Sequence, residues 1–268
     1  MFYDFPNIKK FVVSNFKKAY NFFDDDTFYF AASLSFFTLF SMLPILALVI
    51  AVMSSYTIFS SQIEMFLFFV LDFINPTHSE KVISTIESFL SNIDKLGTLG
   101  LGYLLFVFTM FFKDYENIVS KIHKTEQRSF VAMATLYISF LLLIPVALIV
   151  FTFTSAFVEN SYAKELLDVF FGIALMTFLF KISVNKFVSL KASFISAFIT
   201  LGVLKLTQAM FLYYIIYSTT YSTIYGALSA IVFMFLWIYI SWIIYLYGIK
   251  ICHKLNVKYT ENSIGMNI

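Results

Sequence analysis

Long stretches without charged residues alternate with short charged connections along this chain of 268 residues. A helix needs about 20 apolar residues to cross the roughly 30 Å hydrocarbon layer of a membrane. Six stretches meet or approach that length, which predicts an all-α, polytopic membrane protein with six transmembrane helices. The fourth stretch is long enough only if Asp168 and Lys181 extend toward the two interfaces. The predicted spans are 28–53, 96–112, 130–157, 166–184, 192–217 and 224–249.

The basic residues alternate in number from one connection to the next. The seven segments outside the spans carry 4, 2, 4, 1, 3, 0 and 3 Lys or Arg residues in chain order, so fourteen fall on one side of the membrane and three on the other. Cytoplasmic segments carry the excess of Lys and Arg in membrane proteins. We therefore predict that both termini lie in the cytoplasm.

Three segments outside the spans have characters of their own. Residues 1–26 form a basic amphipathic pattern, which predicts a cytoplasmic helix on the inner leaflet, with a solvated tail as the alternative. Residues 54–95 predict an external helical cap, in which the apolar run 63–74 is interfacial or re-entrant because it is too short to cross. Residues 251–268 are predicted to be a cytoplasmic tail.

Composition supports the membrane assignment and narrows the function. Hydrophobic residues make up 60% of the chain and charged residues 13%, against about 25% charged in soluble proteins. The net charge of +2 gives no basic surface for nucleic acid, so we expect no nucleic-acid partner. Cys252 is the only cysteine, which excludes an intrachain disulfide. Arg128 is the only arginine among 18 basic residues, a lysine bias typical of AT-rich genomes.

No pattern of catalytic or metal-binding residues is present. The three histidines fall in different connections without the HExxH spacing of zinc proteases, and we expect His123 on a solvated cytoplasmic face. Nucleophile elbows, Walker loops and dinucleotide fingerprints are absent from the sequence. The sequence therefore predicts no catalytic residue, no cofactor and no metal site, and favours a protein that is not an enzyme.

Lys205 is the one charge placed deep in a predicted span. It lies about 14 residues, or roughly 20 Å, from the inner end of the fifth span, and a charge at that depth costs at least about 2.5–3.5 kcal/mol. With Gln208 it is a candidate contact for an anionic lipid or a small anionic substrate. The alternative is a structural lysine satisfied by carbonyls or by a carboxylate of another span. Asp168 is expected to be a poor partner because it lies near the outer end of its own span.

Small residues along the spans are candidates for helix packing, because they let helix backbones approach closely. Pro44 removes a backbone donor and can bend the first span. We expect Trp237 and Trp242 to supply lipid-facing bulk. The candidate bend and packing positions are Pro44, Ser35, Thr38, Gly226, Ala230 and Gly248.

Three stretches together resemble the YihY/BrkB family of bacterial inner-membrane proteins. The first is Asp24–Asp26 followed by Ala31–Pro44, and the last is Tyr221–Leu228 followed by Leu236–Gly248. Asn117-Ile118, which precedes several basic residues, is similar to the family's second cytoplasmic connection.

The resemblance implies a six-span protein of the bacterial inner membrane whose molecular activity is not established. It favours transport or handling of an anionic or lipid-like envelope component, in contact with the lipid bilayer. A scaffolding subunit that binds a partner protein is the alternative, and the tRNA-processing ribonuclease label once used in the family is a remote one. Lys205 and Lys250 stand where the family usually has acids, which disfavours a proton-linked role. The oligomeric state stays open.

Overall fold

The computed structural model describes residues 26–54, 97–158, 160–217 and 229–265, with 80, 83, 84 and 88 besides. This part of the chain is all-helical, as expected, and contains no strand. Each helix overlaps one predicted span. The helices are α2 (Thr27–Ser54), α5 (Gly97–His123), α6 (Phe130–Ala156), α7 (Ser161–Ile182), α8 (Leu190–Tyr217) and α10 (Ser229–Gly265).

Two stretches within the described helices are both long and apolar enough to cross a membrane by length and hydropathy alone. They are Leu190–Ile215 in α8 and Ile231–Thr260 in α10. Shorter apolar stretches are Thr27–Ser41 and Phe130–Phe140. That all six helices cross the membrane remains a prediction.

Two helices extend beyond the spans predicted for them. α5 continues to His123, although the predicted span ended at residue 112, because Ile118 and Val119 keep an apolar face buried beyond the first charges. α10 continues to Gly265 and so takes up most of the predicted tail of 251–268. The predicted segments 1–26 and 54–95 lie almost entirely outside the described residues.

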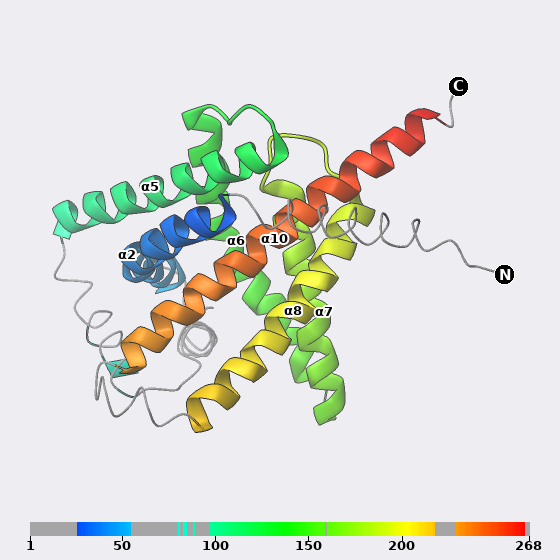
Figure 1. Ribbon diagram of the computed structural model, residues 1–268. Helices are drawn as coiled ribbons and strands as arrows, with labels where there is room; N and C mark the ends of the chain where they lie inside the picture. The colour runs from blue at the N-terminus through cyan, green and yellow to red at the C-terminus, as the bar shows by residue number, and fades with distance from the viewer. Residues whose placement is uncertain are drawn as a thin grey trace.

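α10 is the central element of the bundle (Figure 1). It runs between α2 and α5 on one side and α7 and α8 on the other, and its most extensive contacts are with α8 and α2. α7 packs mainly on α8, whereas α2 packs mainly on α10 and α5. α6 completes the bundle through contacts with α2, α5 and α7.

Polar side chains cap three helices at their N-termini. Ser129 Oγ accepts a hydrogen bond from the Ala132 amide at the start of α6, and Ser189 Oγ accepts one from the Ala192 amide at the start of α8. Asn160 Oδ1 accepts from the Tyr162 amide at the start of α7. These side chains satisfy amides that have no partner within their own helix. The connections 124–129 and 183–189 lie at one end of the bundle, which is the predicted cytoplasmic end.

The seam between α8 and α10 is closely packed because both helices present small residues. A side chain at Gly248 would clash with Thr200, and its Cβ would lie 2.7 Å from Phe180 Cζ. Thr200 is buried, and its hydroxyl donates to the Ser196 carbonyl of its own helix at 2.7 Å. The Thr200 hydroxyl is thus satisfied within its own helix, and the small residues let the two helix backbones meet at close range.

Both tryptophans take part in packing, so the expectation that they supply lipid-facing bulk was wrong. Trp237 is 1% exposed and packs on Phe211 with ring centroids 5.5 Å apart. Trp242 Nε1 donates to Thr38 Oγ1 at 2.8 Å and so links α10 to α2. Thr38 in turn donates to the Leu34 carbonyl at 2.7 Å.

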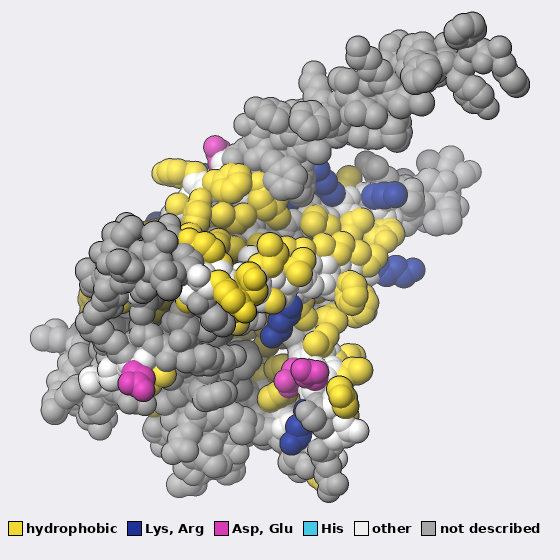
Figure 2. Space-filling view, turned by 60° about the horizontal axis from the view of Figure 1, so that its bottom comes forward, with side chains coloured by type: hydrophobic (Ala, Val, Ile, Leu, Met, Phe, Trp, Pro, Cys, Tyr) yellow, Lys and Arg dark blue, Asp and Glu magenta, His cyan; other side chains and the backbone are white. Residues whose placement is uncertain are grey.

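The outer surface of the bundle carries many large apolar side chains. Figure 2 shows one face of the molecule, on which hydrophobic side chains cover most of the described surface and charges appear at separate points. Exposed examples from four helices are Phe36, Phe106, Phe170 and Phe198. Such a surface is too apolar for contact with water and suits contact with lipid.

We predict that Gly248→Ala destabilises the protein by about 1–3 kcal/mol, because the added methyl group meets Thr200 and Phe180. The measurement is thermal unfolding of the purified protein in lipid nanodiscs. Gly202→Ala is the matched control, because nothing lies within 4 Å of its added Cβ. The control should be neutral or gain up to about 1 kcal/mol from helix propensity. Equal stability of the two variants would contradict the close packing of α8 on α10.

Candidate functional site

Arg128, in the connection that follows α5, forms a buried ion pair with Glu116 of α5. Arg128 Nη1 lies 2.8 Å from Glu116 Oε2 and 3.1 Å from Glu116 Oε1. The side chain of Glu116 is 2% exposed and that of Arg128 is 11% exposed. The Arg128 amide also donates to Glu116 Oε1, at 3.2 Å. Both members of the pair are therefore held away from solvent, where an unpaired charge is costly.

The same two residues reach α6 and α7. Arg128 Nη2 donates to the Ile182 carbonyl at 2.7 Å, and Nη1 donates to the Ser183 carbonyl at 3.1 Å. These carbonyls end α7, where the helix dipole favours a cation. Tyr137 of α6 donates its hydroxyl to Glu116 Oε2 at 2.9 Å. One ion pair thus connects α5, α6 and α7 at the predicted cytoplasmic end.

A planar guanidinium with several donors suits this position better than a lysine ammonium would. The other 17 basic residues of the chain are lysines. The single arginine stands at a position where its side chain donates to a carboxylate and to two carbonyls. Sequence reasoning missed both Arg128 and Glu116. The signal that was available is the single arginine itself, in a connection that also carries Glu116.

We predict that Arg128→Met destabilises the protein by about 3–5 kcal/mol, because it leaves the Glu116 carboxylate buried without its counter-ion. Arg128→Lys should also lose stability, since one ammonium cannot reach Glu116 and both carbonyls of α7. Thermal unfolding in nanodiscs measures the effect, and Lys191→Met, which removes an exposed charge, is the control. A loss no larger than that of the control would refute the role assigned to Arg128.

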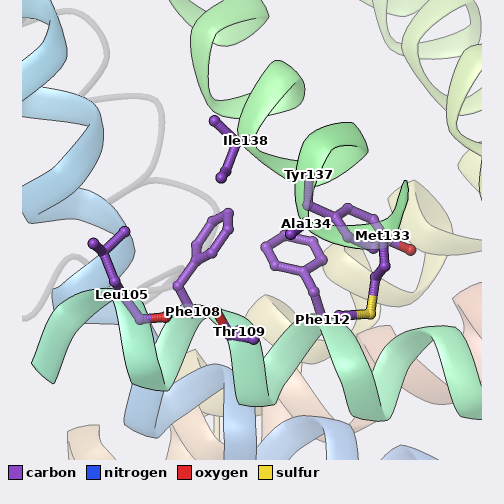
Figure 3. Close-up of a pocket in the computed structure, with 8 residues that line it drawn as sticks. All are labelled: Leu105, Phe108, Thr109, Phe112, Met133, Ala134, Tyr137 and Ile138. Atoms are coloured by element: carbon purple, nitrogen blue, oxygen red, sulfur yellow. Dashed lines mark hydrogen bonds between the residues drawn. The ribbon is translucent and has the colours of Figure 1, made fainter. Parts of the chain in front are cut away.

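A shallow groove runs between α5 and α6 next to the ion pair (Figure 3). Figure 3 shows the rings of Phe108 and Phe112 reaching from α5 toward α6, where Ala134 and Tyr137 face them. Phe112 stacks on Tyr137 with ring centroids 4.1 Å apart. The residues that line the groove are Leu105, Phe108, Thr109, Phe112, Met133, Ala134, Tyr137 and Ile138.

The groove opens on the apolar outer surface. Its flanking residues Leu105 and Ile138 are exposed, and Thr109 Oγ1 donates to the Leu105 carbonyl of its own helix, so the groove offers little free polarity. Lys113 lies one helical turn beyond Thr109 on α5, toward the predicted cytoplasmic end, and is exposed. An apolar groove with a cation near its mouth can hold a hydrocarbon chain that ends in an anionic group.

Lys205 and Gln208 lie near the middle of α8. Lys205 is exposed and makes no hydrogen bond or ion pair with any described residue, while Gln208 is half-buried. The two positions are on one face of α8, since they are three residues apart. Neither residue lines the groove between α5 and α6.

The register of α7 against α8 brings Asp168 to the level of Lys205. A Cβ at Gly172 of α7 would meet Leu201 Cδ2 of α8 at 3.2 Å, and each charge lies one helical turn beyond this contact, in the same direction along the bundle. Asp168 is about 21 Å from the end of α7 at Ile182, and Lys205 is about 22 Å from the start of α8. Asp168 and Lys205 therefore lie at similar depths on neighbouring helices, although no ion pair joins them in the described structure, and Asp168 as a poor partner stays a prediction.

The remaining candidate positions fall in three groups. Ser35 is buried in α2 and donates to the Ala31 carbonyl, and Thr38 bonds Trp242 as described above. Pro44 lies inside the continuous helix α2, and Ala230 lies near the start of α10. Gly226 lies outside the described residues.

His123 is buried, with 1% exposure, so the expectation of a solvated face was wrong. It ends α5, and its ring packs edge-on against that of His253 of α10 at 5.0 Å between centroids. The basic residues around it in the sequence suggested exposure. The fold places α10 over this end of α5 instead, which no local pattern indicated.

We predict that Lys205→Met does not lower thermal stability, because the lysine is exposed, has no partner in the described structure, and is an unfavourable charge inside the bilayer. Asp168→Asn should behave in the same way. Unfolding in nanodiscs is again the measurement. A large loss in Lys205→Met, matched in Asp168→Asn, would show that the lysine is structural and is satisfied by that carboxylate.

The comparisons with known proteins agree on one family. The sequence profile of the family described as Virulence factor BrkB matches residues 19–265. A UPF0761 membrane protein of Legionella pneumophila is 26% identical over 96% of this chain, and the chain spans 64% of that relative's length. A UPF0761 membrane protein of Pseudoalteromonas translucida is 29% identical over 90% of this chain and 85% of its own length.

The names of these relatives describe membrane proteins and give no activity. No solved structure matches the chain. The groove, the ion pair and the charged side chains of the helices are therefore the features that bear on the function of this chain.

Proposed function

Because the chain belongs to the Virulence factor BrkB family of membrane proteins, and because a groove faces its apolar surface, we propose that it binds and moves an anionic, lipid-like component of the cell envelope. The observation that carries this proposal is the groove between α5 and α6, with Lys113 near its mouth. The protein lies in the bacterial inner membrane with both termini in the cytoplasm.

The groove is small, with a volume of about 30 Å³, so it would contact only part of a hydrocarbon chain, and its chemistry suits that contact. Phe108 and Met133 are buried and form apolar walls, while the small side chain of Ala134 leaves room between the two helices. Lys113 lies one helical turn from Thr109 of the groove. The phosphate of an inner-leaflet lipid would lie at this level when part of its chain contacts the groove. A lysine at the membrane surface attracts an anionic lipid by about 1 kcal/mol.

Lys205 and Gln208 supply a second polar contact on the membrane-facing side, about 22 Å from the predicted cytoplasmic end of α8. An ammonium in this position favours an anionic headgroup as its counter-ion, because an unpaired charge inside the bilayer is unfavourable. A substrate that passes from the inner-leaflet groove toward the other leaflet would meet Lys205. Movement across the membrane is therefore the activity proposed for this pair of contacts.

Scaffolding is the second candidate function, and one observation favours it. α8 presents an exposed surface that carries Lys205, which has no partner among the described residues. A partner helix with an acidic residue could pair with this face. Co-purification of a partner protein at a fixed ratio, lost in Lys205→Met, would support scaffolding over lipid handling.

Filling the groove tests binding. We predict that Ala134→Leu lowers the fraction of spin-labelled phosphatidylglycerol that the protein immobilises in nanodiscs, because the larger side chain occupies the space of the lipid chain. Ala132→Leu is the matched control on α6, since Ala132 is exposed and does not line the groove. Lys113→Gln should reduce the preference for phosphatidylglycerol over phosphatidylcholine by about fivefold. Equal immobilisation by both leucine variants would contradict the groove as a lipid site.

Movement is tested separately in liposomes that contain the purified full chain. We expect wild-type protein to transfer a fluorescent anionic lipid between leaflets, and Lys205→Met to abolish the transfer while thermal stability is kept. Full transfer by Lys205→Met would reject the role of the lysine. Failure of wild-type protein across a panel of anionic lipids, with binding in the groove retained, would leave a lipid-binding protein that does not transport.

A further inference from the structure

A cluster of buried polar atoms without partners lies at the end of α5. Ser120 is 3% exposed and His123 is 1% exposed. Six buried side-chain nitrogen and oxygen atoms lack a hydrogen-bond partner in the described parts of the chain, and four of them belong to Ser120, His123 and Thr125. Buried polar groups almost always bind protein, water or a ligand, so four neighbouring atoms without a protein partner mark a polar site.

The cluster is compact because three segments meet there. Ser120 and His123 are one turn apart on α5, and the chain then turns through Lys124, whose φ is 53°. This turn brings the Thr125 amide onto the Ser120 carbonyl at 3.0 Å. His253 of α10 closes the other side through its edge-on contact with His123. We refer to Ser120, His123, Thr125 and His253 as the His123 cluster.

The surroundings of the His123 cluster are positively charged. Burial lowers the pKa of His123 to about 3, with further contributions from His253 and Lys186. Burial also lowers the pKa of His253, and Lys186 and Lys124 add to that effect. Both imidazoles are therefore neutral at pH 7, while two exposed lysines stand close enough to act on them. Neither lysine side chain has an ion pair or hydrogen bond with a described residue.

This chemistry disfavours a metal ion and favours an anion. The described residues contain no group of three His, Cys, Asp or Glu side chains that could hold a metal. The nearest acid on α5, Glu116, is bound to Arg128. Two hydroxyls, the imidazole N–H groups and two ammonium groups are instead all donors. A phosphate group accepts from such donors, and a protonated phosphate oxygen can also donate to an imidazole lone pair.

We propose that the His123 cluster binds a phosphate group at the predicted cytoplasmic end, supplied either as free phosphate or as a lipid headgroup. Lys124 and Lys186 attract the anion from the cytoplasm or from the membrane surface. His253 is half-buried and covers the cluster, so rotation of this one side chain admits the phosphate to Ser120 and Thr125. The site is separate from the groove and from Lys205, and it goes beyond the function proposed above.

Selective isotope labelling of histidine tests the proposal on the full chain. The sequence has only three histidines, so the spectrum of the labelled protein in phosphatidylcholine nanodiscs contains few signals, and His78 serves as an internal reference. We expect sodium phosphate, at an ionic strength held constant with sodium chloride, to shift the signals of His123 and His253 but not that of His78. The signals are assigned with single His→Gln variants.

Two variants and a control show which groups bind. Lys186→Met should weaken the apparent affinity for phosphate by about tenfold, and Ser120→Ala by a similar factor, because each removes one donor to a charged ligand. Lys164→Met removes an exposed lysine from the first turn of α7, at the opposite end of that helix from Lys186, and should leave the affinity unchanged.

The lipid composition identifies the source of the phosphate group. Shifts in phosphatidylglycerol nanodiscs without added phosphate would identify a lipid headgroup, and shifts caused by sodium phosphate in phosphatidylcholine nanodiscs would identify free phosphate. Either result, with the expected loss in Lys186→Met, supports the proposal. Unchanged histidine signals under both conditions would overturn it, as would equal shifts with sodium chloride alone or equal affinity in Lys186→Met.

Discussion

The arrangement of the helices at the predicted cytoplasmic end depends on the ion pair between Arg128 and Glu116. Either charge would be costly if it were buried here without its partner. The ion pair must therefore form as the helices that carry the two residues pack together. Arg128 binds the last carbonyls of α7 through Ile182, and Glu116 binds Tyr137 of α6. The pair therefore specifies how three helices meet, in addition to any stability that it contributes.

The shape of the groove follows from this constraint. Glu116 holds the hydroxyl of Tyr137, and the Tyr137 ring stacks on Phe112, which forms part of the groove wall. The distance between α5 and α6 is thus set by a polar contact below the groove and by aromatic stacking beside it. The proposed lipid contact depends on the same residues that position the helices, although neither Arg128 nor Glu116 lines the groove.

The sequence predicted the helices well and the polar contacts poorly. Long uncharged runs locate the helices because a membrane span requires them, and all six described helices begin within five residues of the predicted start. The burial of His123 and the partner of Glu116 depend on which helices come together, and hydropathy carries no information about that choice. The depth of Lys205 followed from counting residues, whereas the matching level of Asp168 required the register of α7 against α8.

The proposed lipid handling therefore presupposes that the end of the bundle is held rigid by the buried pair. A double-mutant cycle with Glu116→Gln, Arg128→Met and the double variant, followed by unfolding in nanodiscs, measures the coupling between the two side chains most directly. We expect the double variant to be more stable than the sum of the single losses predicts, with a coupling energy of about 2 kcal/mol or more. Losses that add to within about 0.5 kcal/mol would contradict the account.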